Sequence, residues 1–212
     1  MRHMQAFVVS LVAFGVVGIV APGSARAQAV ADPASDAKIW VGGHLGLSPL
    51  GTLKAEAMGT SDSTDAATAF EIGGRLEFQV APLVSIGIAP TILLGVKSKD
   101  ASDSATQLDL PLRIAVGGEV APKIRIYGFA APGYSILFPP SSGTGDTQHP
   151  SGFMIGFGGG VGYRIAPKFT LAGELSYQFR FWSESVDVLG TSVDISAQDN
   201  FLTFSLAATA GF

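Results

Sequence analysis

The sequence predicts an all-β fold: an eight-stranded antiparallel up-and-down transmembrane β-barrel, preceded by a signal peptide. Three observations predict it. Eight segments alternate apolar and polar side chains with the period of two that is typical of a β-strand. Three near-identical Ala-Pro turns alternate with four longer, polar connections. The first 27 residues have the organisation of a cleavable secretory signal.

Residues 1–27 form the predicted signal peptide. Arg2 supplies a basic start, residues 6–20 are an uncharged, mostly apolar run, and Ala25-Arg26-Ala27 has the small-x-small pattern of a cleavage site. The alternative is a membrane-anchoring helix, but this run is shorter than the roughly 20 residues that span a bilayer. After residue 20 no apolar run approaches spanning length, which excludes a helical membrane protein.

Composition excludes several classes of function. Cleavage after Ala27 would remove two of the 13 basic residues and leave 185 residues with 11 basic and 17 acidic side chains, a net charge of −6. Such a chain does not suit nucleic acid, because lysine and arginine must neutralise phosphates. The sequence has no cysteine, which excludes disulfides, thiolate metal sites and thiol catalysis.

The predicted mature chain divides into a short polar periplasmic lead, 28–36, and one barrel domain, 37–212. The eight strands are expected at 38–48, 69–80, 83–96, 107–120, 123–138, 152–165, 169–182 and 201–212. The second is the most regular, with Phe70, Ile72 and Leu76 on one face and charged residues on the other. A closed barrel presents such strands to lipid without an unpaired edge.

The connections are of two kinds. Ala81-Pro82, Ala121-Pro122 and Ala166-Pro167 make tight turns, because proline presets the turn dihedral and cannot continue a paired strand. The long connections are 49–68, 97–106, 139–151 and 183–200. This alternation predicts an outer-membrane barrel with the turns and both termini in the periplasm. The turn spacing of 40 to 45 residues also suits a propeller or solenoid, but the signal and the lipid-side alternation favour the barrel.

Within 183–200, Val186, Val188, Val193 and Ile195 flank a Leu-Gly-Thr-Ser turn, so the last two strands are expected to continue past the membrane as a hairpin. Aromatic residues gather near strand ends and predict two girdles at the headgroup levels. The girdle near the turns comprises Phe78, Tyr163, Phe169 and Phe212, and the girdle near the loops comprises Phe70, Tyr134, Phe138, Phe153, Phe179, Phe181 and Phe201.

Alternation alone does not say which face is inside, and a soluble lipocalin-like barrel would turn its apolar face inward. The uncharged apolar face favours the membrane, since Lys or Arg at the midplane costs roughly 2 to 4 kcal/mol. The polar face carries every arginine of the mature chain and five carboxylates. The predicted lumen network is Glu71, Arg75, Glu77, Asp109, Arg113, Glu119, Arg125, Arg164, Glu174 and Arg180. An eight-stranded interior is filled by side chains, so we expect a plugged, charge-balanced lumen.

The glycines at 156, 158, 160 and 162 recur on the polar face of the sixth strand. One interpretation is a groove into which Tyr127, Phe129 and Arg180 pack from flanking strands. The other is that the glycines serve barrel curvature.

The last twelve residues alternate strictly and end on Phe212, although chain ends usually fray. This ending resembles the terminal strand of small outer-membrane barrels, typified by the outer-membrane protein A transmembrane domain and the porin-like β-barrel domain family. Leu108-Asp109-Leu110-Pro111-Leu112-Arg113 is similar to the family's fourth strand. The resemblance covers 38–212 and implies that Phe212 closes the barrel and is read by the assembly machinery. It implies no substrate.

Catalytic and metal patterns are missing from the sequence. His44 lies on the polar face and is interpreted as a network member, while His149 lies in a loop before Pro150. Neither the His-x-Ser-Asn pattern, which resembles outer-membrane lipid deacylases, nor a Gly-x-Ser-x-Gly elbow is present. The glycine run fits no dinucleotide motif. We therefore predict no catalytic residue, cofactor or metal. The acidic loops could bridge lipopolysaccharide through Ca²⁺ or Mg²⁺, or simply be solvated.

These observations favour a non-enzymatic outer-membrane protein, a structural or surface anchor that presents four extracellular loops to an unknown partner. Its expected partners are outer-membrane lipid, lipopolysaccharide and the assembly machinery. The alternative is a narrow channel for small or hydrophobic solutes, as the outer-membrane protein W type is thought to be. An envelope lipid hydrolase is a third hypothesis, and it would require lipid turnover that His44→Ala abolishes.

The signal peptide makes the first testable prediction. Protein purified from the envelope should begin at Gln28, because signal peptidase cleaves after the small residue of Ala25-Arg26-Ala27. Intact-mass measurement would check this. Replacing Ala27 with a bulky residue should leave an uncleaved precursor, and a wild-type protein that retains residues 1–27 would contradict the prediction.

Overall fold

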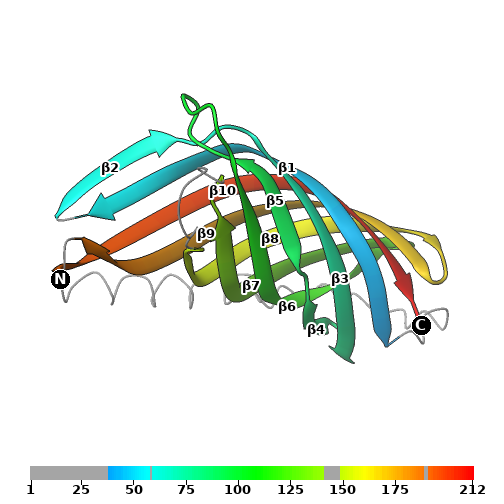
Figure 1. Cartoon of the computed structure of the whole chain (residues 1–212). Helices are drawn as coiled ribbons and strands as arrows, with labels where there is room; N and C mark the ends of the chain where they lie inside the picture. Colours follow the sequence, from blue (N-terminus) through cyan, green and yellow to red (C-terminus); the bar gives the residue numbers. More distant parts are fainter. Residues whose placement is uncertain (1–37, 58, 141–148, 189–190) are drawn as a thin grey trace, which may run out of the picture. The chain divides into compact units, whose positions relative to one another are not determined.

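A computed structural model describes residues 38–57, 59–140, 149–188 and 191–212 (Figure 1). The predicted signal peptide, its cleavage site and the lead 28–36 lie outside these residues and stay predictions. None of the described residues forms a helix of the length and hydropathy needed to cross a membrane. The described chain is an antiparallel β-structure throughout.

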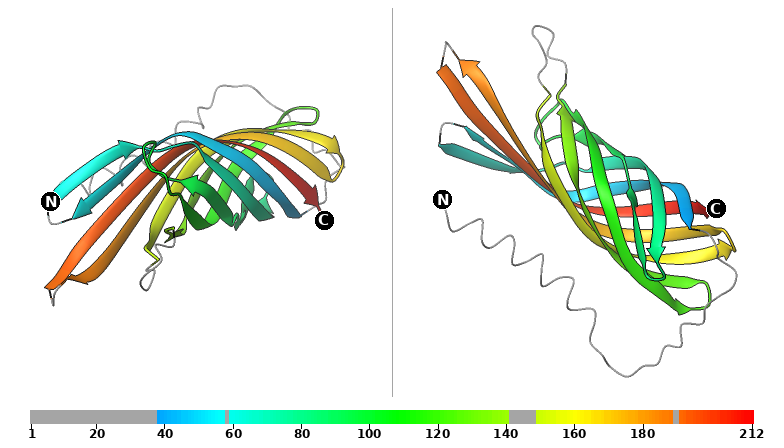
Figure 2. Two further views of the ribbon diagram at one scale, coloured as in Figure 1. Left: turned by 45° about the horizontal axis from the view of Figure 1, so that its top comes forward. Right: turned by 90° about the horizontal axis from the view of Figure 1, so that it is seen from below.

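Ten strands form one sheet that closes on itself. They are β1 (Ile39–Ala57), β2 (Thr60–Asp65), β3 (Ala69–Ala81), β4 (Val84–Ile88), β5 (Thr91–Val96), β6 (Ala105–Ala121), β7 (Ile124–Phe138), β8 (Ser151–Ala166), β9 (Phe169–Val188) and β10 (Thr191–Gly211). Around the ring the order is β1, β10, β9, β8, β7, β6, β4/β5 and β3 (Figure 2). The short strands β4 and β5 follow one another along the chain and together fill one position between β6 and β3, and β3 pairs again with β1. The predicted eight-stranded up-and-down barrel is confirmed.

The ring closes through β1. This strand pairs with β3 from Ile39↔Phe78 to Ser48↔Ala69 and with β10 from Trp40↔Gly211 onward. The backbone N–H of Phe212 donates to the carbonyl of Ile39 at 2.9 Å, and the N–H of Lys38 donates back to Phe212 at 3.1 Å. The last residue of the chain is therefore hydrogen-bonded to the first strand.

The three Ala-Pro connections are two-residue turns, as predicted, and lie together at the end of the barrel that we call the turn end. Lys123 of the second turn has a φ of 68°, a left-handed conformation that the equivalent Leu83 and Lys168 of the other two turns do not adopt. The opposite end carries the long connections and is called the loop end.

The predicted third strand, 83–96, is interrupted. Ala89 and Pro90 separate β4 from β5, because proline has no N–H to donate to a neighbouring strand. The carbonyl of Pro90 still accepts a hydrogen bond from the N–H of Gly74 at 2.9 Å. The interruption therefore leaves the ring closed at this point.

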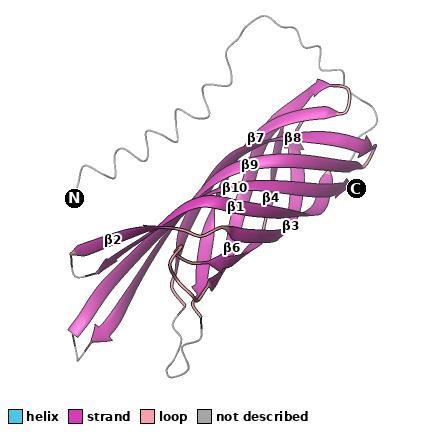
Figure 3. Cartoon of the chain, turned by 90° about the horizontal axis from the view of Figure 1, so that it is seen from above, coloured by secondary structure: helices cyan, strands magenta, loops and turns pink. Residues whose placement is uncertain are grey.

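The longest departure from the prediction lies at the loop end. The connection 49–68 was expected to be a loop, but residues 52–57 of β1 pair with β2 on one side and with β10 on the other. The hairpin expected from the last two strands is present, and β9 and β10 pair up to Thr191↔Val188. Two hairpins, β1–β2 and β9–β10, thus continue past the ring (Figure 3), and β1 pairs with β10 up to Ala57↔Ile195, which joins the four strands in one ribbon. The Thr- and Ser-rich sequence of β2 favours extended backbone but carries no apolar alternation that would predict it.

The two faces of the barrel have opposite chemistry. Apolar residues point outward, where Leu206 is 73% exposed, whereas Arg180 is 0% exposed and points into the lumen. This arrangement suits lipid and is opposite to that of a lipocalin-like barrel. One predicted girdle residue is wrong: Phe201 is 0% exposed and packs inside, because it shares the inward parity of Thr203 and Ser205.

The glycines of β8 accommodate aromatic side chains inside the barrel. A Cβ on Gly158 would lie 2.5 Å from the Phe129 ring, and one on Gly160 would lie 2.7 Å from the Tyr127 ring. The groove interpretation therefore holds for both aromatic residues. The hydrogen bonds of Arg180 run to Asp109, Asp199 and Gln178, and its packing against these glycines stays a prediction.

Replacement of these glycines tests the groove. Gly160→Ala should destabilise the barrel by about 1 to 3 kcal/mol, because the added methyl group overpacks against Tyr127 and Glu174. Gly173→Ala is the matched control, since a Cβ there meets nothing within 4 Å. Both changes lower the entropy of the unfolded chain equally, so their difference isolates the clash. Urea titration of the folded gel band would measure it, and equal midpoints would contradict the groove.

Candidate functional site: the lumen

Polar side chains fill the lumen in three clusters, stacked along the barrel. On β9, Glu174, Gln178 and Arg180 follow one another from the turn end to the loop end, and each belongs to a different cluster. The turn-end cluster is Arg75, Glu77, Arg113, Tyr127 and Glu174. The central cluster is His44, Glu71, Thr91 and Gln178. The loop-end cluster is Gln107, Asp109, Ser135, Arg180 and Asp199.

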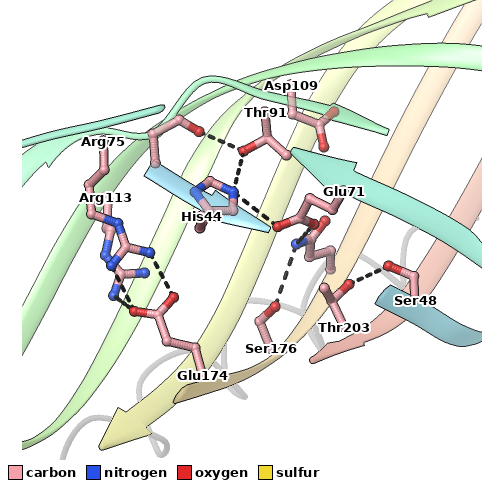
Figure 4. A network of polar contacts seen from close by, with 12 residues as sticks. His44, Ser48, Glu71, Arg75, Thr91, Asp109, Arg113, Glu174, Ser176 and Thr203 are labelled. Carbon is pink, nitrogen blue, oxygen red and sulfur yellow. Dashed lines mark hydrogen bonds and ion pairs between the residues drawn. The ribbon is translucent and has the colours of Figure 1, made fainter. Parts of the chain in front are cut away.

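The turn-end cluster is centred on Glu174. Arg75 donates to both carboxylate oxygens, at 2.8 and 2.7 Å, and Arg113 Nη2 donates to Oε1 at 2.8 Å (Figure 4). Glu77 accepts from Arg113 Nε at 2.9 Å and completes two acids against two bases. In the ring, β3 and β6 each lie three strands from β9, so these bonds cross the lumen. Bidentate arginine pairs are suited to such an enclosed site.

Two aromatic residues hold this cluster in place. The Tyr127 hydroxyl donates to Glu174 at 2.5 Å, and the Arg113 guanidinium lies 3.6 Å from the centre of the Phe129 ring. Both rings rest on the β8 glycines. The small residues of β8 thus make room for the groups that fix Glu174 and Arg113.

Nearer the turns, Arg164 forms an ion pair with Glu119, and Arg125 lies over the Tyr127 ring at 5.7 Å. The structure therefore distributes the ten predicted lumen residues over several groups. Four belong to the turn-end cluster, Asp109 pairs with Arg180, Glu71 pairs with His44, and the remaining three lie toward the turns.

The central cluster contains the buried histidine. His44 Nε2 lies 3.1 Å from Glu71 Oε1 and 3.2 Å from Thr91 Oγ1. Because the Thr91 hydroxyl donates to the Ala89 carbonyl at 2.9 Å, it accepts from His44, and Nε2 must carry the proton. A catalytic triad needs the carboxylate and the hydroxyl on different ring nitrogens. Here both contact the same nitrogen, so His44 cannot take a proton from Thr91.

The loop-end cluster joins the predicted Arg180 and Asp109 to Asp199, which was not among the predicted lumen residues. Arg180 donates to Asp109 Oδ2 from Nε and Nη2, at 2.9 and 2.6 Å, and to Asp199 Oδ1 from Nη1 at 3.1 Å. Its Nη2 also contacts Gln178, which reaches Glu71 at 3.3 Å and connects the clusters. Asp199 was assigned to a loop. Its parity, which is that of the polar-face residues Thr203 and Ser205, was the signal that could have placed it in the lumen.

An apolar cap lies beside this cluster at the loop end. Its buried members are Ala66, Ala69, Leu93, Val96 and Phe201. The Phe201 ring lies 5.7 Å from the Arg180 guanidinium. The cap comes from residues around the predicted loop 49–68 and from inward positions of β5 and β10, which no sequence pattern marked as a core.

Side chains from opposite walls meet at several levels of the lumen. Cross-lumen ion pairs, a buried histidine and an apolar cap occupy successive levels of an eight-stranded interior, which is only wide enough for side chains. Among the described residues, no three His, Asp or Glu side chains gather in the way that a metal centre requires. These features define a membrane-spanning β-barrel whose lumen is filled by its own side chains.

The chain belongs to the outer membrane protein beta-barrel domain family, which it matches over residues 16–211. It is therefore an integral protein of the bacterial outer membrane. A sequence comparison with curated proteins gives no match.

Solved structures show the same fold. Neisserial surface protein A is 13% identical, with 82% of this chain and 97% of that chain covered and a TM-score of 0.54. OprG from Pseudomonas aeruginosa is 12% identical, with coverages of 81% and 95% and a TM-score of 0.52. AlkL, solved in DMPC bilayers, is 13% identical, with coverages of 83% and 90% and a TM-score of 0.53. At these identities the likeness concerns the fold alone.

Removing one base from the turn-end cluster tests its energetic role. Arg113→Ala should destabilise the barrel by about 3 to 5 kcal/mol, because Glu77 and Glu174 stay buried and lose a partner. Lys99→Ala is the control, since its pair with Asp65 is solvent-exposed and should be worth about 1 kcal/mol or less. Heat-modifiability gels and urea titration would measure both, and similar small effects would count against a tightly coupled network.

Proposed function

We propose that the protein is a non-conducting, non-enzymatic surface anchor, whose barrel holds its loop-end structures outside the cell. The observation that carries this proposal is the filled lumen. Glu174 binds side chains from β3, β6 and β7, and Arg180 binds Asp109 three strands away. Opening a path would require breaking charged hydrogen bonds in a site of low dielectric, where unpaired groups are costly.

The four-stranded ribbon supports the presenting role. Residues 52–57 of β1 are paired on both sides, so the polar strand β2 is held on a sheet. Such a ribbon offers a partner a preorganised surface, and little ordering entropy is lost on contact. We propose that lipid and lipopolysaccharide cover the apolar wall and that the barrel-assembly machinery reads the exposed Phe212 at the turn end.

A non-enzymatic role is supported by both histidines of the described chain. The shared nitrogen of His44 prevents base catalysis on Thr91, and the exposed His149 packs its ring against Phe138 at 4.9 Å. A hydrolase would need a nucleophile bonded to a histidine nitrogen that is free to accept its proton. The described contacts of His44 include none. Lipid turnover that is lost in His44→Ala would overturn this part of the proposal.

Planar-bilayer recording separates the anchor from the alternative, a narrow channel for small or hydrophobic solutes. Wild-type protein should give no steady conductance, because charged pairs cross the lumen at two levels. Arg180→Ala and Arg113→Ala should each introduce measurable current if the pairs form the seal, whereas Lys99→Ala should not. Steady wild-type conductance, or uptake of an apolar solute by vesicles containing the protein, would instead support the channel.

A further inference from the structure

The loop-end cluster holds more negative than positive charge. Asp109 and Asp199 are 1% and 0% exposed, and both are bound by the same fully buried cation, Arg180. With both carboxylates ionised, these three residues have a net charge of −1. A buried charge without a counter-charge is strongly disfavoured, so the cluster favours a further positive species.

Three buried oxygens of this cluster have no hydrogen-bond partner among the described residues: Asp199 Oδ2, Gln107 Oε1 and Ser135 Oγ. Gln107 and Ser135 are each 0% exposed. The Gln107 amide nitrogen donates to Asp109 Oδ1 at 3.0 Å, which places its free Oε1 beside that carboxylate. Ser135 stands directly opposite Asp109 on β7. One free oxygen therefore belongs to Asp199 itself, and the other two belong to residues that are bonded to Asp109 or pair with it across the strands.

The donor set selects the chemistry of the ligand. Carboxylate, amide and hydroxyl oxygens are hard ligands, which suit alkali and alkaline-earth cations and not an anion or a soft metal. A net charge of −1 matches a single positive charge. A divalent ion would leave the cluster positive, and the described residues supply no third carboxylate or histidine to the group. Trp182 Nε1, also buried without a partner, is only a donor and cannot be a ligand.

The polarity of the whole lumen agrees with this choice. In the central and loop-end clusters, three carboxylates, Glu71, Asp109 and Asp199, share one arginine, Arg180, and the histidine His44, which pairs with Glu71. Toward the turn end, four arginines face three carboxylates: Arg75, Arg113, Arg125 and Arg164 against Glu77, Glu119 and Glu174. The electrostatic potential therefore attracts cations to the loop-end half.

We propose that the loop-end cluster is a buried binding site for a monovalent alkali cation, Na⁺ or K⁺. Asp199, Gln107, Ser135 and Asp109 supply the oxygens, and Arg180 sets the net charge at the value that one such ion neutralises. The ion completes the outer half of the network and ties β6, β7 and β10 together across the lumen.

Thermal unfolding of the complete folded protein in detergent tests the site. The transition of the heat-modified gel band would be followed in NaCl, KCl and LiCl, against N-methyl-D-glucamine chloride at equal ionic strength. We expect a saturable, ion-selective rise in transition temperature for the wild type, because a ligand that binds only the folded state stabilises it. Asp199→Asn should abolish the selectivity, and Ser135→Ala should weaken the apparent affinity several-fold. Asp65→Asn, which removes an exposed carboxylate, should behave as the wild type.

Equal transition temperatures in all four salts would overturn the proposal, as would ion selectivity that persists in Asp199→Asn. A transition that varies with pH but not with the cation would mean that a proton alone neutralises the cluster. If Asp199→Asn does not fold, the apparent ion affinity of Ser135→Ala and the structure of wild-type crystals grown in RbCl test the site instead. Anomalous density between Asp109 and Asp199 is expected there, and its absence at saturating Rb⁺ would contradict the site. None of these outcomes changes the expectation of a sealed lumen.

Discussion

Closure of the sheet is the constraint on which the rest of the structure depends. A backbone N–H or carbonyl that faces hydrocarbon has no water to bond, so every strand must have two neighbours. Here β1 meets both β3 and β10, and the final residue bonds back to Ile39. Closing with eight strands leaves an interior of side-chain width. The polar groups that point into it must then satisfy one another, which explains why the acids and bases occur in clusters.

The narrow interior also explains the glycines of β8. Two large rings, Tyr127 and Phe129, stand inside a tube that must already hold two arginines and two glutamates. There is room for them only where the neighbouring strand β8 carries glycines in place of larger side chains. The two rings contact Glu174 and Arg113, so the packing of aromatic side chains on glycines helps to set the geometry of the charged cluster.

Much of this could be predicted from the sequence, because a period of two and a proline turn are local signals. They locate the strands of the ring to within a few residues and assign the parity of Arg75, Arg113 and Glu174. Pairing across the lumen depends on register and on which strands lie opposite, and no local pattern encodes that. Asp199 was misplaced because the polar residues around it look like a loop, although the strand continues through it. Phe201 was assigned to the lipid face because it is an aromatic residue at a strand end, although its parity points inward. The break between β4 and β5 at Pro90 was not predicted, because the apolar alternation has the same parity on both sides of it.

The ribbon at the loop end has a consequence for how the protein meets the outside. A protease binds its substrate as an extended chain whose backbone groups are free, and surface loops are the usual sites of cleavage. Over residues 52–57 both edges of β1 are already bonded, over a length of about 20 Å at the rise of a β-strand. This part of the surface is therefore long, polar and close to the extracellular medium, yet it offers an attacking enzyme no free backbone. Exposure and resistance to digestion are combined in one strand.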